Sequence, residues 1–173
     1  MAVSVPNQVL ADLQSGGVEQ SLWPALVALA RYESNWTAGA KGDYTLDYKT
    51  YYHASVAPPG SWPTSFGYLQ MNINGLGSGH APSNLLNGPY NLRLGAQYIR
   101  NRLAAGASMW DAMQPWSVRP TAYPFYEQIL REGIAGVGGI TPAPVDPAQP
   151  GSINFAREGL ALVLLVALAL ALH

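Results

Sequence analysis

The chain contains no cysteine among its 173 residues. This absence excludes a disulfide framework, a thiol nucleophile and a cysteine-ligated zinc site. It does not identify the cellular compartment, because a chain without cysteine suits an oxidising or a reducing environment equally well.

Charged residues are also scarce. They make up 11% of the chain, the formal net charge is -1, and Lys and Arg form no run. A nucleic-acid-binding protein needs a basic surface that displaces counterions, so the composition predicts no nucleic-acid partner. A polyanionic substrate would have to be held by local contacts, because so small a net charge exerts little long-range attraction.

The two ends of the chain differ in apolar content. The first 17 residues have no Lys or Arg and no apolar run, so we expect no secretory signal there. Residues 160–172, in contrast, contain no polar side chain. As a helix they would measure about 20 Å, against about 30 Å for a hydrocarbon core. We interpret them as a short membrane anchor; a helix buried against a partner protein or against its own domain is the alternative.

A Gly- and Pro-rich stretch precedes this apolar run. Residues 135–156 include Gly pairs and several prolines, a composition typical of linkers rather than of helices or central strands. We therefore divide the chain into a globular body (1–134), a linker (135–156) and an apolar tail (157–173).

Apolar periodicity in the body predicts a mostly α-helical domain with a small β element. Ser21 is a good N-cap for a helix that has Pro24 in its first turn. Alternating tyrosines in residues 43–54 indicate a β-hairpin or an extended loop, and 74–88 are expected to be loop. The expected helices cover residues 6–14, 21–34, 66–71, 89–105 and 123–132.

Glu33 lies near the end of the second expected helix. At 100° per residue it falls on the same stripe as Leu22, Leu26 and Leu29, which faces the core. Partial burial disfavours a charged carboxylate and raises its pKa, as a general acid requires; the catalytic acid of lysozyme is a known example of this arrangement. Judged by periodicity alone, a Glu at such a position is more often solvated or paired than catalytic. The catalytic interpretation of Glu33 therefore depends on the neighbouring motifs.

Three motifs follow one another in the body: RYESNW (31–36), SFGYLQMN (65–72) and NGPYNLRLGAQYIRNRL (87–103). Their order and spacing resemble the soluble lytic transglycosylase family, most closely its bacteriophage virion versions, and goose-type lysozymes share that fold. The resemblance covers roughly residues 5–132. It implies an α+β lysozyme-like fold, helical and two-lobed with a small β-hairpin region.

The resemblance also implies roles for individual residues. Glu33 would protonate the bond between N-acetylmuramic acid and N-acetylglucosamine, then act as base on the muramoyl C6 hydroxyl and leave a 1,6-anhydro product. Ser65, Gln70 and Asn72 of the second motif would bind substrate in the cleft. Gly67 would let the backbone approach the catalytic helix.

The chain departs from the family pattern further on. Where many members have A-Y-N-A-G, residues 113–118 read MQPWSV, and Trp116 is a candidate stacking face for a sugar. Tyr123 and Tyr126 both match the family's cleft tyrosine, and we prefer Tyr123. Asp43, or less favourably Asp47, is a possible second carboxylate, which an inverting hydrolase would need.

No metal or cofactor is expected, because His53, His80 and His173 share no ligand spacing. We therefore predict an enzyme that cleaves peptidoglycan glycan strands and is anchored by residues 160–172, as in the internal membrane of a phage virion. The alternatives are a hydrolytic muramidase on the same fold, and a non-catalytic glycan-binding or structural virion membrane protein. A membrane-active, holin-like protein is a further alternative that the folded body argues against.

Overall fold

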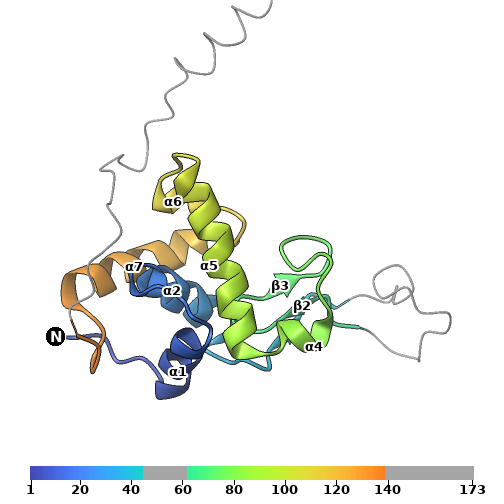
Figure 1. The fold of residues 1–173 in the computed structure, drawn as a ribbon, viewed down its shortest axis with the longest axis horizontal. Coiled ribbons are helices and arrows are strands. Elements are labelled where there is room, and N and C mark those ends of the chain that lie inside the picture. Colours follow the sequence, from blue (N-terminus) through green and yellow to red (C-terminus); the bar gives the residue numbers. More distant parts are fainter. Residues whose placement is uncertain (45–61, 139–173) are drawn as a thin grey trace, which may run out of the picture.

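The computed structural model describes residues 1–44 and 62–138, and about half of them are helical (Figure 1). The helical elements are α1 (Asn7–Ser15), η1 (Gln20–Leu22), α2 (Trp23–Ser34), α4 (Pro82–Leu85), α5 (Gly88–Ala104), α6 (Met109–Ala112) and α7 (Arg119–Glu132). The strands are β1 (Lys41–Gly42), β2 (Ser65–Phe66) and β3 (Met71–Asn72). The prediction of a mostly α fold with a small β element is confirmed.

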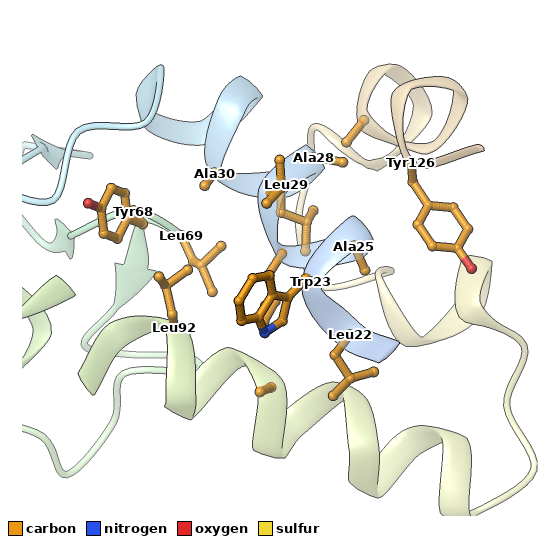
Figure 2. Close-up of a cluster of buried hydrophobic side chains, with 14 of the residues drawn as sticks. Leu22, Trp23, Ala25, Ala28, Leu29, Ala30, Tyr68, Leu69, Leu92 and Tyr126 are labelled. Atoms are coloured by element: carbon orange, nitrogen blue, oxygen red, sulfur yellow. The ribbon is translucent and has the colours of Figure 1, made fainter. Parts of the chain in front are cut away.

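Helix α2 is the centre of the core. Every residue from Trp23 to Ala30 is buried, so the helix is enclosed on all sides rather than along the narrow stripe that the sequence predicted. It packs mainly against α7, and Figure 2 shows its side chains within the buried cluster that also contains Leu69, Leu92 and Tyr126. A helix this enclosed has little freedom to move its last turn, which carries Glu33.

Helix α5 lies between the two parts of the body. In Figure 1, α4 and the strands are on one side of α5, and α1, α2 and α7 are on the other. A glycine permits its close packing, because a Cβ at Gly95 would lie 2.2 Å from Leu69 Cδ1 and 3.2 Å from Leu26 Cδ2. The helix begins one residue before its predicted start and has Pro89 in its first turn as expected. The Asn87 side chain, which was not predicted as a cap, accepts a hydrogen bond from the Tyr90 N–H at 3.1 Å.

The three strands form one antiparallel sheet in the order β1-β2-β3. Lys41 pairs with Phe66, and Ser65 pairs with Asn72. The predicted helix over residues 66–71 is therefore wrong. The backbone at Gly67 has φ +78° and that at Gln70 has φ +44°, and left-handed residues at these two positions cannot continue a right-handed helix. The segment instead makes a tight connection between β2 and β3.

Other boundaries differ from the expectation for local reasons. Ser21 lies within η1, so α2 starts at Trp23 without a side-chain cap, although Pro24 is in its first turn as predicted. Helix α7 starts four residues earlier than expected, and Pro124 lies inside it. Helices α4 and α6 were not predicted, because four residues are too few to show a helical period.

The N-terminal segment pairs with the segment that follows α7, at the end of the globular body. Val3 and Ile134 form a parallel bridge in which the Val3 N–H donates to Gly133 O and the Ala135 N–H donates to Val3 O, both at 2.9 Å. Val137 also packs against the core. Most of the Tyr-rich stretch, Asp47, most of the linker and the apolar tail lie outside the described residues. In the part that is described, no helix combines the length and apolar character needed to cross a membrane.

Candidate active site

A cavity of about 410 Å³ lies where α2, the sheet, α5 and the segment before α7 meet. Six of the seven candidate site residues line it: Glu33, Asp43, Ser65, Gln70, Asn72 and Trp116. Their sequence positions span more than eighty residues, so the fold brings them together. Tyr123, the seventh candidate, does not line this cavity.

Glu33 is partly buried in the last turn of α2. The pKa of its carboxyl is raised from 4.5 to about 7; burial is the largest cause, the negative charge of Asp43 adds to it, and a hydrogen bond with the Val118 backbone opposes it. A carboxyl with this pKa is protonated in a large fraction of molecules near neutral pH, and it can then donate a proton. The geometry thus agrees with the desolvation that the sequence led us to expect.

Asp43 is held in the cavity by a short chain of hydrogen bonds. The Ser65 hydroxyl donates to Asp43 Oδ2, and Asn72 Nδ2 donates to Ser65 Oγ at 3.1 Å and to Thr64 Oγ1 at 3.2 Å. The Asn72 Oδ1 atom accepts from the Asn74 N–H at 2.8 Å. Ser65 and Asn72 are cross-strand partners in the sheet, so the pairing of β2 with β3 fixes the orientation of this carboxylate.

Gln70 is fixed at the turn between β2 and β3. Its Nε2 donates to Gly67 O at 2.9 Å, and its Oε1 lies so close to Gly42 that a Cβ there would be 2.3 Å away. The absence of a side chain at Gly42 therefore makes room for the Gln70 amide at the cavity wall. Sequence reasoning selected Gln70 but gave Gly42 no role.

Unfavourable backbone conformations gather around the cavity. Among the described residues, the non-glycine positions with positive φ are Asn35, Trp36, Asp43 and Gln70. Asp43 and Gln70 line the cavity, and the other two directly follow the helix that carries Glu33. Asn35 is the left-handed C-cap that ends α2, and Asn and Asp tolerate this conformation better than other side chains do. The strain, about 1–3 kcal/mol for each position, is therefore expected mainly at Trp36 and Gln70.

Side chains of α5 and α1 hold the turn that carries Gln70. The buried Asn91 side chain accepts from the Leu69 N–H at 2.9 Å and donates to Phe66 O and Leu85 O at 3.0 and 2.9 Å. From α1, Asp12 accepts from the Tyr68 hydroxyl at 2.8 Å, and burial together with this hydrogen bond raises the pKa of Tyr68.

Gly67 belongs to the same arrangement. A Cβ there would lie 2.2 Å from Leu85 O and 2.4 Å from Asn91 Nδ2. The close approach that we expected at Gly67 therefore exists, but it is to the start of α5 and to α4 rather than to α2. Asn91 lay within the third motif, yet nothing in the motif signalled that its amide would hold the turn.

Trp116 forms an aromatic wall of the cavity with Tyr98. The residue is 4% exposed, its ring packs edge-to-face with Tyr98 at 5.7 Å between centroids, and its Nε1 donates to Leu69 O at 3.0 Å. This hydrogen bond fixes the indole and leaves only part of it facing the cavity. Tyr98 was not selected from the sequence.

Tyr123 and Tyr126 lie elsewhere on α7. Tyr123 packs against Trp110 at 5.0 Å between ring centroids, and burial, with smaller contributions from Glu127 and Asp111, raises its pKa. Tyr126 is buried, which raises its pKa to about 12. Neither ring lines the cavity, so the structure gives no reason to prefer Tyr123 as a substrate contact.

Within residues 1–44 and 62–138, no three His, Asp or Glu side chains are grouped as metal ligands would be. Comparison with known proteins gives no further guide: the chain matches no protein-family model, no curated protein and no solved structure.

Proposed function

We propose that this protein cleaves the β-1,4 bond between N-acetylmuramic acid and N-acetylglucosamine in peptidoglycan, as a lytic transglycosylase with Glu33 as its catalytic residue. The observation that carries the proposal is a partly buried carboxyl with a pKa of about 7 on the wall of a cavity. The polar side chains around it come from the motif positions that resemble this family.

The proposed reaction uses Glu33 twice. The protonated carboxyl gives its proton to the glycosidic oxygen as the bond from that oxygen to C1 of the muramoyl residue breaks. The carboxylate then takes the proton of the C6 hydroxyl as O6 bonds to C1, which forms the 1,6-anhydro ring. No water is consumed, and Glu33 returns to its protonated state. The acetamido group of the substrate assists at C1, so this route needs no second carboxylate.

Ser65, Gln70, Asn72 and Trp116 act as substrate-binding residues in this proposal, and the body as a two-lobed lysozyme-like domain. The apolar residues 160–172 act as a membrane anchor, and we place the protein in the internal membrane of a phage virion, from which it reaches the host wall. These assignments rest on the sequence motifs, on the apolar run and on the position of the cavity between the sheet and the helices.

A hydrolytic muramidase is the rival that a specific observation favours. Asp43 lines the same cavity as Glu33, and its charge acts on the Glu33 carboxyl. An inverting hydrolase uses a second carboxylate to activate water, at about 6.5–9.5 Å from the acid. A hydrogen bond from Ser65 holds Asp43 in place, as a base of that kind would require.

The test is to incubate the full chain, in a mild detergent, with purified peptidoglycan, beside the Glu33→Gln variant. Mass spectrometry of the released muropeptides separates the two chemistries, because anhydro ends are lighter than hydrolytic ends by one water. We expect anhydro products from the wild type and none from the variant. Full-mass reducing ends would give the reaction to a hydrolase, and no Glu33-dependent release would leave a glycan-binding or structural virion protein.

A further inference from the structure

The start of α7 lies against the carboxyl of Glu33. Val118 is the N-cap of α7, and a hydrogen bond between its backbone and Glu33 lowers the pKa of that carboxyl. A hydrogen bond has this effect when it is donated to the charged form, so the Val118 N–H is the donor and a Glu33 oxygen is the acceptor. The N-terminus of a helix also favours a nearby negative charge. The position of this turn therefore affects how readily Glu33 gives up its proton.

Arg119, the residue after Val118, connects this turn to α6. Its Cζ lies 4.3 Å from the centroid of the Trp110 ring, and its Nη1 donates to Trp110 O at 3.4 Å. One turn later, Tyr123 packs edge-to-face on the same indole at 5.0 Å between centroids. Residues four apart lie on one face of a helix, so Arg119 and Tyr123 contact Trp110 from the same side of α7. Helix α6 in turn packs against α5, which gives the contact a fixed support.

The Arg119 side chain lacks an acidic partner. Among the described residues, the ion pairs join Met1 to Glu132 and Arg100 to Glu19, and the Nε atom of Arg119 is buried there without a hydrogen-bond partner. Removing such a group from water is unfavourable, and it offsets part of the roughly 0.5–2 kcal/mol that a cation–π contact contributes. A large contribution of Arg119 to the free energy of unfolding is therefore not expected.

We propose that Arg119 is a positioning residue, which fixes the first turn of α7 through its contacts with Trp110. It acts on Glu33 through Val118, because the fixed turn keeps the Val118 N–H directed at the carboxyl. The inference rests on the proposed function for its effect on catalysis, whereas its effect on the carboxyl can be measured without any substrate. It also accounts for Tyr123, which does not line the cavity, as the second α7 residue that contacts the indole.

Replacing Arg119 by Met gives the expected size of the effect. The change keeps an unbranched side chain but removes the charge and the N–H donors, so the turn moves more freely and the Val118 N–H holds the carboxylate less firmly. We expect the pKa of Glu33 to rise by about 0.5, the equivalent of a roughly threefold weaker hold on the charged form. A weaker acid donates its proton more slowly, so muropeptide release below pH 6 should fall about two- to threefold.

The experiment measures the pKa of Glu33 by NMR, from the ¹³C shift of its side-chain carboxyl in the full chain in mild detergent. Arg119→Met, Trp110→Leu and the double variant are compared. Because both residues act through one contact, the double variant should raise the pKa no further than either single variant does. Arg93→Met is the matched control: the Arg93 guanidinium also lies over a ring, that of Tyr90 at 5.2 Å, but it does not line the cavity.

A pKa of Glu33 that rises in Arg119→Met and in Trp110→Leu, and stays unchanged in Arg93→Met, would support the inference. An unchanged pKa in Arg119→Met would overturn it, even if the variant unfolds at lower urea concentration, because Arg119 would then only join two helices. If Arg119→Met does not fold, Arg119→Lys replaces it; Lys keeps the charge but not the planar stacking group, and the same two outcomes decide.

Failure of the inference and failure of the proposed function give different results. If the wild type cleaves no glycan but the pKa of Glu33 rises in Arg119→Met, the proposed function is wrong and the positioning of the carboxyl stands. If the wild type cleaves glycan and the pKa does not change in the variant, the positioning is wrong and the proposed function stands.

Discussion

Replacing Asp43 by Asn separates the two chemistries that the cavity allows. The change removes a charge but keeps a side-chain oxygen that can accept the hydrogen bond from Ser65. The pKa of Glu33 is raised from 4.5 to about 7, with burial as the larger cause and Asp43 as the smaller one. We therefore expect the variant to lower the pKa of Glu33 by about one pH unit, which corresponds to about 1.4 kcal/mol.

The sign of the activity change follows from the proposed role of Glu33 as an acid. In that role Glu33 must be protonated, so activity falls as pH rises through its pKa, and a lower pKa brings this fall to lower pH. The assay measures initial rates of muropeptide release at subsaturating peptidoglycan from pH 4 to pH 9. Relative to wild type, we expect a loss of about tenfold at pH 8 and a change of less than about twofold at pH 4, where Glu33 is protonated in both proteins.

Two results would refute this reasoning in different ways. Loss of activity at every pH would mean that Asp43 takes part in the chemistry, as in a hydrolase. An unchanged pH profile would mean that its charge does not act on Glu33. Glu19→Gln is the control, because it removes the same charge from an exposed side chain outside the cavity.

Three further predictions concern stability. Because folding raises the pKa of Glu33, the native state loses stability as pH rises from about 4.5 to about 7. After allowance for partial exposure, Glu33→Gln should raise the free energy of unfolding in urea by about 1–3 kcal/mol at pH 8 and leave it unchanged at pH 4. Equal effects at the two pH values would contradict the raised pKa of Glu33. Asn91→Ala removes three hydrogen bonds to backbone groups and should cost about 2–4 kcal/mol, whereas the exposed Asn101→Ala should cost less than about 0.5 kcal/mol. Gly67→Ala and Gly79→Ala share a φ near +78°, but only the first meets backbone; the second should cost about 1 kcal/mol and the first at least about 2 kcal/mol more, and equal losses of thermal stability would rule out the steric explanation.

The long elements could be predicted because their signals are local. Helix α5 has a capping residue, a proline in its first turn and an apolar face of Leu92, Ala96 and Ile99 that repeats along the helix. The connection between β2 and β3 could not be predicted in this way, because its helical pattern of apolar residues arises from contacts with α1 and α5. The turn, with its left-handed positions, is hydrogen-bonded to Asn91 and Asp12, which are distant in sequence, so its conformation is not set by local signals.

In the candidate site, too, some residues could be predicted from the sequence and others could be found only in the structure. Glu33, Ser65 and Gln70 could be named from motif order, because each motif lies on an element whose position the fold sets. Tyr123 and Tyr126 are three residues apart on one helix, and a motif match cannot tell which of the two faces a cavity. Tyr98 needed the structure, because it reaches the cavity only through the position of α5 beside the segment that carries Trp116.

The end of α2 explains why Glu33, of all positions on this helix, is the one where a carboxyl can serve as the proposed acid. Eight consecutive buried residues precede the last turn, so a carboxylate further back would have neither solvent nor substrate. Directly after the helix the chain reverses through Asn35 and Trp36, both left-handed, and the Trp36 indole donates back to Val27 O at 3.0 Å. Glu33 therefore lies in the last turn of α2, between the buried part of the helix and the chain reversal, where a side chain is only partly exposed to solvent. The carboxyl-terminal end of a helix also disfavours a negative charge, so position, burial and the neighbouring Asp43 all act to keep this carboxyl protonated near neutral pH.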